Sequence, residues 1–123
     1  MDIDTILQQY NCEREILNNL LYLLVDNNNV YDILLIFKNN NFNLIDCFAI
    51  NTRNDNYSNT IYYHLLNYEN NENVCIYTHV TNKLTRSIID IFENANWYER
   101  EIYEMYNINF VGHNNLRKLF TEC

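Results

Sequence analysis

The chain has 123 residues, 48% hydrophobic and 15% aromatic, so residues 1–123 can bury a core as a single domain. Its net charge of −8 argues against nucleic acid as a partner, because phosphates demand a basic surface, and equally against an anionic membrane surface. The longest unbroken apolar run, residues 20–25, is far too short to span a bilayer, so we expect no direct membrane insertion.

The sequence does not decide between helix and strand in the N-terminal third of the chain. Its apolar residues recur at helical spacing, at Ile16, Leu17, Leu20, Leu21 and Leu24. Residues 20–25 are equally consistent with a buried strand, and periodicity does not separate the two.

A helix is predicted next, because Asn29 can cap it and four apolar residues share one face: Val30, Ile33, Leu34 and Phe37.

Three extended segments follow, at residues 42–50, 60–66 and 74–80. Asn-rich turns join them as successive antiparallel strands. A further helix is expected to carry Leu84, Ile88 and Ile91. Strands with helices before and after them predict an α+β domain whose helices cover one face of the sheet.

Metal and redox centres are not expected. The cysteines, Cys12, Cys47, Cys75 and Cys123, form no Cys-x-x-Cys pair, and no histidine lies at ligand spacing from a cysteine or carboxylate. We therefore expect no cofactor in this chain, and free thiols in a reducing compartment.

The last predicted helix starts near Asn96. Asn96 and Glu99 have the spacing of a capping box, in which Glu99 reaches back to the start of the helix. Tyr98, Ile102 and Met105 recur four and three residues apart, which predicts a stripe that faces the core.

The opposite side of this helix carries Arg100, Tyr103 and Glu104. Arg100 and Glu104 are four residues apart and can pair across one turn. An exposed tyrosine beside an arginine is typical of a contact surface. The helix is expected to end near Asn107, because asparagine tolerates the left-handed conformation.

The carboxylates of this helix have two interpretations. Glu99, Glu101 and Glu104 are typical of a solvated helix face. The alternative is catalysis, which needs two groups held in different environments; a free-standing small enzyme would use Glu101 and His113.

Residues 99–106 read Glu-Arg-Glu-Ile-Tyr-Glu-Met-Tyr, and six residues later His113 opens His-Asn-Asn-Leu-Arg-Lys-Leu. This spacing resembles the hallmark of the 30 kDa subunit of the proton-pumping NADH:quinone oxidoreductase, respiratory complex I. Residues 61–66 look like the family's second central strand, and residues 87–97 are similar to its Ser-Val-x-Asp-Ile-Trp-Pro-x-Ala-Asn-Trp stretch. The resemblance covers residues 18–120 and implies a two-layer fold with a small mixed sheet, in which residues 20–25 form a strand.

The resemblance also implies a function. The expected role is a non-catalytic peripheral-arm subunit without a redox centre. It would dock on the 49 kDa-type subunit near the quinone site and support electron transfer from NADH to quinone. The chain would thus belong to an enzyme without supplying catalytic residues. The alternative is the equivalent subunit of a membrane-bound hydrogenase or a plastid-type dehydrogenase.

The family signature contains eight residues that we assign to structural or interface roles: Glu99, Arg100, Glu101, Tyr103, Glu104, His113, Arg117 and Lys118. Glu99 is expected to cap the helix, and Arg100 and Glu104 to pair with each other or across the interface. The cationic cluster of His113, Arg117 and Lys118 is expected to contact carboxylates of the partner.

Three departures from the family bear on these expectations. The family usually has Gly at position 107 and Pro at position 114. It also continues into a long tail along the 49 kDa-type subunit, whereas this sequence stops at Cys123, so the tail is lost, supplied by another polypeptide, or absent from a fragment.

Composition and the N-terminus give the expected location. Asparagine occurs 25 times and alanine only at positions 49 and 95, a bias that indicates an A/T-rich genome. The start lacks the Arg-rich character of a mitochondrial presequence. We therefore expect an organelle-encoded subunit on the matrix side of the mitochondrial inner membrane, or a subunit at the cytoplasmic face of a bacterial plasma membrane.

Overall fold

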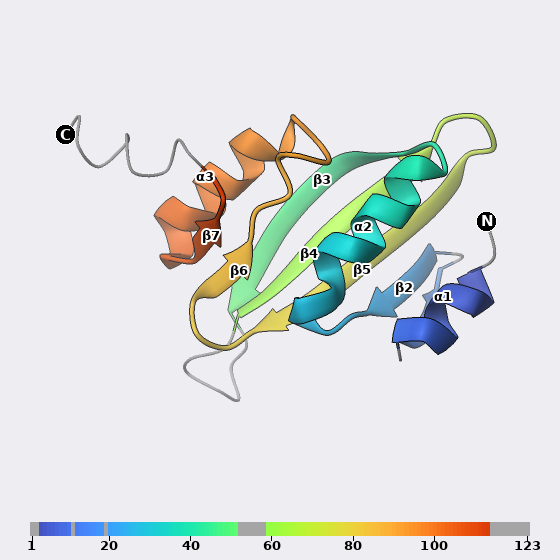
Figure 1. Ribbon diagram of the computed structural model, residues 1–123, viewed down its shortest axis with the longest axis horizontal. Helices are drawn as coiled ribbons and strands as arrows, with labels where there is room; N and C mark the ends of the chain where they lie inside the picture. Colours follow the sequence, from blue (N-terminus) through green and yellow to red (C-terminus); the bar gives the residue numbers. More distant parts are fainter. Residues whose placement is uncertain (1–2, 11, 19, 52–58, 114–123) are drawn as a thin grey trace.

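The computed structural model describes residues 3–10, 12–18, 20–51 and 59–113 (Figure 1). The elements in chain order are α1 (Ile3–Tyr10), β1 (Glu13–Leu17), β2 (Leu20–Leu24), the 3₁₀ turn η1 (Asn27–Asn29), α2 (Val30–Asn39), β3 (Phe42–Asn51), β4 (Asn59–Asn67), β5 (Glu72–Val80), β6 (Leu84–Arg86), α3 (Ala95–Tyr106) and β7 (Asn109–Val111). No helix among these residues is long and apolar enough to cross a membrane.

Strands β1 to β5 form one mixed sheet in the order β1-β2-β5-β4-β3. Only the β2–β5 pair is parallel; the other three pairs are antiparallel. The three strands predicted in the middle of the sequence are β3, β4 and β5, and their antiparallel order is confirmed. Asn41, in the turn between α2 and β3, and Asn71, in the turn between β4 and β5, have φ of 70° and 60°, which asparagine tolerates better than most residues.

The open choice in the N-terminal third is resolved as a β-hairpin. Strands β1 and β2 pair across a turn in which Asn18 has a φ of 52°. The helical interpretation of residues 16–24 is wrong, and the strand implied by the family resemblance is confirmed. Tertiary contacts decide between helix and strand here. Strand β2 pairs with the central strand β5, and Leu23 lies opposite Ile76 in the core.

Helix α2 buries the four apolar residues that the sequence predicts for it: Val30, Ile33, Leu34 and Phe37. Asn29 occupies the N-cap position, as predicted, but its side chain makes no capping hydrogen bond. The capping oxygen comes three residues earlier, where Asp26 Oδ1 accepts from the Asn28 amide at 3.0 Å. A 3₁₀ turn at residues 27–29 precedes the helix. The side-chain cap therefore lies at the start of this 3₁₀ turn and not at the start of α2.

The core lies between one face of the sheet and helices α2 and α3. In Figure 1, α2 crosses the sheet and α3 lies beside β3. The buried residues of both helices join those of the central strands in one cluster. An aromatic row crosses the opposite face of the sheet, where Phe48 stacks on Tyr62 and Tyr62 on Tyr77, with ring centroids 5.1 and 5.2 Å apart. The α+β class, with a mixed sheet, is thus as predicted.

The prediction of a helix that carries Leu84, Ile88 and Ile91 is wrong. Leu84 lies in β6, which pairs in parallel with β7, and turns follow it. Ile88 and Ile91 are buried, but Leu84 is 50% exposed. The apolar spacing arises because an irregular segment crosses the edge of the core, which periodicity cannot distinguish from a helix.

Candidate functional site

The signature residues from Glu99 to Glu104 are carried by helix α3, which begins two residues earlier than the predicted cap at Asn96 would place it. The helix starts at Ala95, and its N-cap residue, Asn94, makes no side-chain capping bond. The side-chain amide of Asn94 donates instead to the Leu44 carbonyl in β3, at 2.8 Å, and thereby fixes the start of the helix on the sheet. The capping box expected for Asn96 and Glu99 is therefore wrong.

Glu99 lies on the buried face of α3 and is completely inaccessible to solvent. Ala95, Glu99 and Ile102, at spacings of four and three, are the buried residues of the helix. Ser87 Oγ donates to Glu99 Oε1 at 2.6 Å, and the Ile88 amide donates to Oε2 at 2.8 Å. The carboxyl group therefore ties α3 to the segment that follows β6.

Burial raises the pKa of Glu99 from its ordinary value near 4.5 to about 7. Desolvation is the largest cause, and the hydrogen bonds from Ile88 and Ser87 oppose it only in part. A carboxyl group that titrates near neutrality is a common feature of functional sites, but it is equally produced by a buried structural network. Here no solvent reaches the group, so the geometry supports a structural tie.

His113 lies on the same buried side, only 6% exposed. Its Nε2 is 4.0 Å from Glu99 Oε1 and 3.3 Å from the Asn96 carbonyl oxygen. Because a carbonyl can only accept, Nε2 carries a proton in this contact. The structure thus places His113 against a carboxyl group of its own chain, whereas the sequence predicts partner carboxylates for it.

The proposed enzyme pair is not assembled. Glu101 is exposed, two residues from Glu99 and hence on the other side of the helix, whereas His113 is buried beside Glu99. A general base and its partner must lie within hydrogen-bond reach, which this arrangement does not provide.

The exposed face of α3 differs from the prediction at two large apolar residues. Met105, predicted to face the core, is 64% exposed, and Trp97 is 68% exposed. The prediction that Met105 faces the core is wrong because the buried stripe of the helix runs through Glu99, which is not hydrophobic. The face of the helix that packs on the core is therefore turned away from Met105. Trp97 and Met105 are eight residues apart, close to two helical turns, so they lie on one side of the helix.

Arg100 stacks on this exposed face instead of pairing with Glu104. Its guanidinium carbon is 5.3 Å from the centroid of the Trp97 ring, within the range of a cation–π contact. Arg100 and Glu104, both among the described residues, form no ion pair within 4.0 Å in this structure. Tyr103, expected on the polar face, is half-buried and packs against the core.

Helix α3 ends as predicted. Asn107 has a left-handed φ of 59°, and its amide donates to the Tyr103 carbonyl at 2.9 Å. The remaining two predicted site residues, Arg117 and Lys118, lie outside the described residues.

Sequence reasoning missed two residues of this region, Ser87 and Trp97. Ser87 lies twelve positions from its partner Glu99, beyond any helical or turn spacing, so no local pattern reveals the contact. Trp97 did carry a signal, because it lies four residues before Glu101 on the charged side of the helix.

A family model, the respiratory-chain NADH dehydrogenase 30 Kd subunit, matches residues 23–122. This match covers most of the chain, including α2, strands β3 to β7, α3 and the signature. The chain therefore belongs to the 30 kDa subunit family of the respiratory-chain NADH dehydrogenase.

Curated relatives agree with this assignment. The C subunit of NADH-quinone oxidoreductase from Rickettsia prowazekii is 35% identical over 80 residues, which cover 64% of this chain and 41% of that protein. The C/D subunit of the same enzyme from Nitrosospira multiformis is 47% identical over 62 residues, 49% of this chain and 10% of that protein. The chain thus spans less than half the length of these relatives.

Two solved structures share the fold. A trypsin-resistant fragment (1-134) of Nqo5 matches with a TM-score of 0.79 at 18% identity, over 92% of this chain and 98% of that one. A chain of the membrane-bound sulfane sulfur reductase, an archaeal respiratory membrane complex, matches with a TM-score of 0.81 at 22% identity, over 93% and 71%. At these identities the likeness concerns the fold alone.

Proposed function

We propose that this chain is a non-catalytic peripheral-arm subunit of the proton-pumping NADH:quinone oxidoreductase. It docks on the 49 kDa-type subunit near the quinone site and supports electron transfer from NADH to quinone without a cofactor of its own. The outer face of α3, formed by Trp97, Arg100, Glu101, Glu104 and Met105, is one part of the docking surface.

The observation that carries this proposal is the exposure of Trp97. A tryptophan that is 68% exposed, with an arginine stacked on its ring and an exposed methionine nearby, is unfavourable in water but typical of an interface. Tryptophan and arginine are also the residues most enriched at interface hot spots. The relatives named as C/D subunits support a neighbouring subunit held close to this domain.

The test compares Trp97→Ala and Arg100→Ala with a matched control, Tyr68→Ala, in binding to the 49 kDa-type subunit from the same source. Tyr68 is an aromatic residue with 64% exposure in the turn after β4, away from α3. We expect both α3 variants to weaken binding by about tenfold or more, as hot-spot residues do. Tyr68→Ala should bind like the wild type.

The same variants should leave the isolated fold intact, because an exposed cation–π contact contributes only about 0.5–1 kcal/mol. Thermal unfolding of each isolated variant checks this. If Trp97→Ala and Arg100→Ala bind as tightly as Tyr68→Ala, α3 is not part of the docking surface.

Arg117 and Lys118 complete the proposed attachment, as cations that meet carboxylates of the partner. Arginine recognises a carboxylate through two parallel hydrogen bonds, which lysine cannot reproduce. Arg117→Lys should therefore weaken docking even though it conserves charge. Equal affinity of Arg117→Lys and the wild type, with a loss only for Arg117→Gln, would reduce the role of Arg117 to its charge.

The alternative is the equivalent subunit of a related membrane complex, such as a membrane-bound hydrogenase or a plastid-type dehydrogenase. The fold shared with a chain of the archaeal sulfane sulfur reductase complex keeps this alternative open. A co-purifying large subunit that retains nickel-ligating cysteines would favour the hydrogenase. In the proposed role, the chain lies on the matrix side of the mitochondrial inner membrane or at the cytoplasmic face of a bacterial one.

A further inference from the structure

Helices α2 and α3 pack on one face of the main sheet, and the opposite face is built from the alternate residues of its strands. The residue pairs of neighbouring strands place these residues in rows that run across the sheet from β3 to β1. One row contains Phe48, Tyr62, Tyr77, Leu24 and Glu13. The next row contains Asp46, His64, Cys75, Tyr22 and Glu15. We call the surface formed by these two rows the open face.

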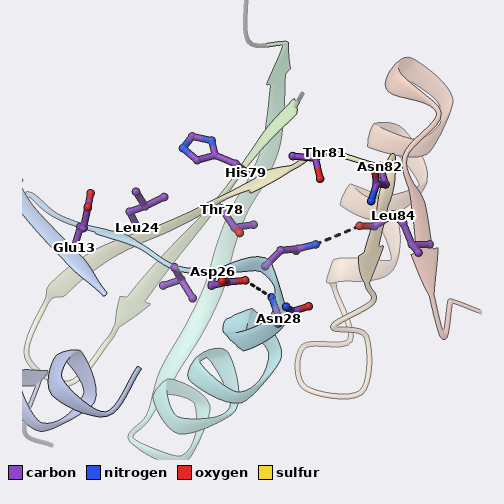
Figure 2. Close-up of a pocket in the computed structure, with 11 residues that line it drawn as sticks. Glu13, Leu24, Asp26, Asn28, Thr78, His79, Thr81, Asn82 and Leu84 are labelled. Atoms are coloured by element: carbon purple, nitrogen blue, oxygen red, sulfur yellow. Dashed lines mark hydrogen bonds between the residues drawn. The ribbon is translucent and has the colours of Figure 1, made fainter. Parts of the chain in front are cut away.

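The two faces of the sheet are separated clearly in Figure 2, where β2 and β5 end beside a cavity. Leu24 and His79 project to the side of the open face, whereas Thr78 projects toward α2. Phe48 in the first row is 44% exposed, and Ile50, two residues further along β3, is 43% exposed. Large apolar side chains therefore meet water on this side of the sheet, as they do at interaction sites.

The rings of the first row are ordered against one another. Phe48 and Tyr62 are stacked with their planes 10° apart, and Tyr62 and Tyr77 with theirs 16° apart. Tyr22 extends the aromatic surface to β2 through an edge contact with Tyr77, with ring centroids 6.5 Å apart. Rings that are already held in place lose little conformational entropy on binding, so this surface is preorganised for contact.

The acidic residues of the open face lie at its two ends. Glu13 and Glu15 are at the β1 end and Asp46 is at the β3 end, and all three are exposed. The two rows, all of whose residues the structure describes, contain no lysine or arginine. Arg14 points to the other face, since it pairs with the buried Leu23. Five strands about 4.8 Å apart put the two acidic ends about 19 Å from each other.

This arrangement of charge disfavours several occupants. Aromatic residues on a sheet can stack nucleic-acid bases, but the phosphates would meet carboxylates here instead of cations. An anionic membrane surface is disfavoured for the same reason. A second copy of the chain, docked through the same face, would bring further carboxylates into the contact. The open face therefore favours a cationic protein surface.

We propose that the open face docks a surface of another protein whose middle is apolar and whose lysine or arginine side chains lie at two points about 19 Å apart. One cationic point meets Glu13 and Glu15, and the other meets Asp46. Apolar side chains between them cover the rings of Phe48 and Tyr62. An apolar centre with a polar rim is the usual composition of a protein interface. The inference does not rest on the proposed docking of α3, which packs on the other face of the sheet.

The occupant is identified by photo-crosslinking in the assembly purified from the source through a tag on this chain. The photoreactive amino acid replaces Ile50 or, as the matched control, Leu35, which is 39% exposed on α2. We expect the Ile50 position, and not the Leu35 position, to join this chain to a segment of another protein that contains lysine or arginine. Cross-links from Ile50 to a second copy, to residues 114–123, to nucleic acid or to a segment without cations overturn the proposal. The same cross-link from both positions, or none from Ile50, also overturns it.

Charge complementarity is tested by the rate of association with the cross-linked protein. Glu15→Gln and Asp46→Asn remove a charge and keep the shape, and Asp46→Asn retains the oxygen that accepts from the Cys47 amide at 2.9 Å. Each variant should slow association about threefold or more at low salt and flatten its dependence on salt concentration. Glu69→Gln, an exposed change in the turn between β4 and β5, should associate like the wild type. If the rates of all three variants coincide, the carboxylates of the open face do not recognise the partner.

Phe48→Ala tests the apolar middle of the contact. This variant should raise the dissociation rate about tenfold, as loss of an aromatic anchor does. Tyr68→Ala removes an exposed ring outside the open face and should leave the rate unchanged. Thermal unfolding of the isolated variants checks that both fold, and equal dissociation rates refute the contact. A loss of binding with Trp97→Ala but not with Phe48→Ala would support α3 and remove the open face, and the reverse pattern would support the open face alone.

Discussion

The buried carboxyl group of Glu99 makes the stability of this domain dependent on pH near neutrality. Replacement by glutamine keeps the shape of the side chain but removes the ionisation. The oxygen of the introduced glutamine can still accept from one of the two donors, Ser87 Oγ or the Ile88 amide, but its nitrogen cannot accept from the other. Glu99→Gln therefore separates the effect of charge burial from the effect of the hydrogen bonds.

The magnitude follows from the two pKa values. The folded-state pKa of Glu99 is raised to about 7, whereas an unfolded glutamate titrates near 4.5. The folded state thus holds this proton more tightly, and the resulting stability is fully present below pH 4.5 and lost as the pH rises through about 7. The difference corresponds to about 3 kcal/mol in the free energy of unfolding.

The assay is urea unfolding followed by circular dichroism at several pH values between 4.5 and 8. The wild type should lose about 3 kcal/mol relative to Glu99→Gln over this range. Glu101→Gln, an exposed change on the same helix, should show no such divergence. A difference that stays constant would mean that folding does not raise the pKa of Glu99 above its unfolded value. A difference of opposite sign would mean that a protonated His113, 4.0 Å away, holds it as an ion pair.

Three further predictions concern the fold. Phe37→Ala should cost about 3–5 kcal/mol in urea unfolding, because Phe37 is fully buried and packs edge-on against Phe42. Asn107→Ala should cost about 1 kcal/mol at its left-handed φ of 59°, whereas Asn107→Gly should be close to neutral in the same measurement. The Cys47 thiol should react with a thiol reagent only after unfolding, since it is buried and burial raises its pKa well above the usual range.

The middle of the chain could be predicted because its signals are local. In α2, four apolar residues follow the helical period, and β3, β4 and β5 are bounded by asparagines that adopt left-handed turns. Antiparallel strands joined by short turns pair with their neighbours in sequence, so the order β5-β4-β3 follows directly.

The N-terminal hairpin and β6 were not decided by local signals. Strand β2 pairs with β5, and β6 pairs with β7, across long stretches of sequence. The residues of β2 satisfy the helical period as well as the extended one. Their state is set by a partner strand that a short sequence window does not contain, and the family resemblance supplied what periodicity could not.

The candidate site was misread for a related reason. A glutamate in a charged helix is exposed in most proteins, and Met105 is the better core residue by composition. The structure reverses this assignment, because Ser87, the Ile88 amide and His113 together solvate the Glu99 carboxyl group within the fold. All of these partners lie more than ten residues away, so no helical pattern contains them.

The burial of Glu99 and the exposure of Met105 change the roles assigned to the signature residues. Among the described residues of the signature, Glu99 and His113 are buried together, Tyr103 packs against the core, and Arg100 on the outer face of α3 stacks on Trp97. Because Glu99 occupies the buried stripe, the helix is rotated so that Trp97 and Met105 face solvent. A hydrophobic residue at position 99 would relieve charge burial but would also release Ser87 and the Ile88 amide from their acceptor. The buried acid thus fixes the helix in the one orientation that presents an aromatic and cationic surface outward.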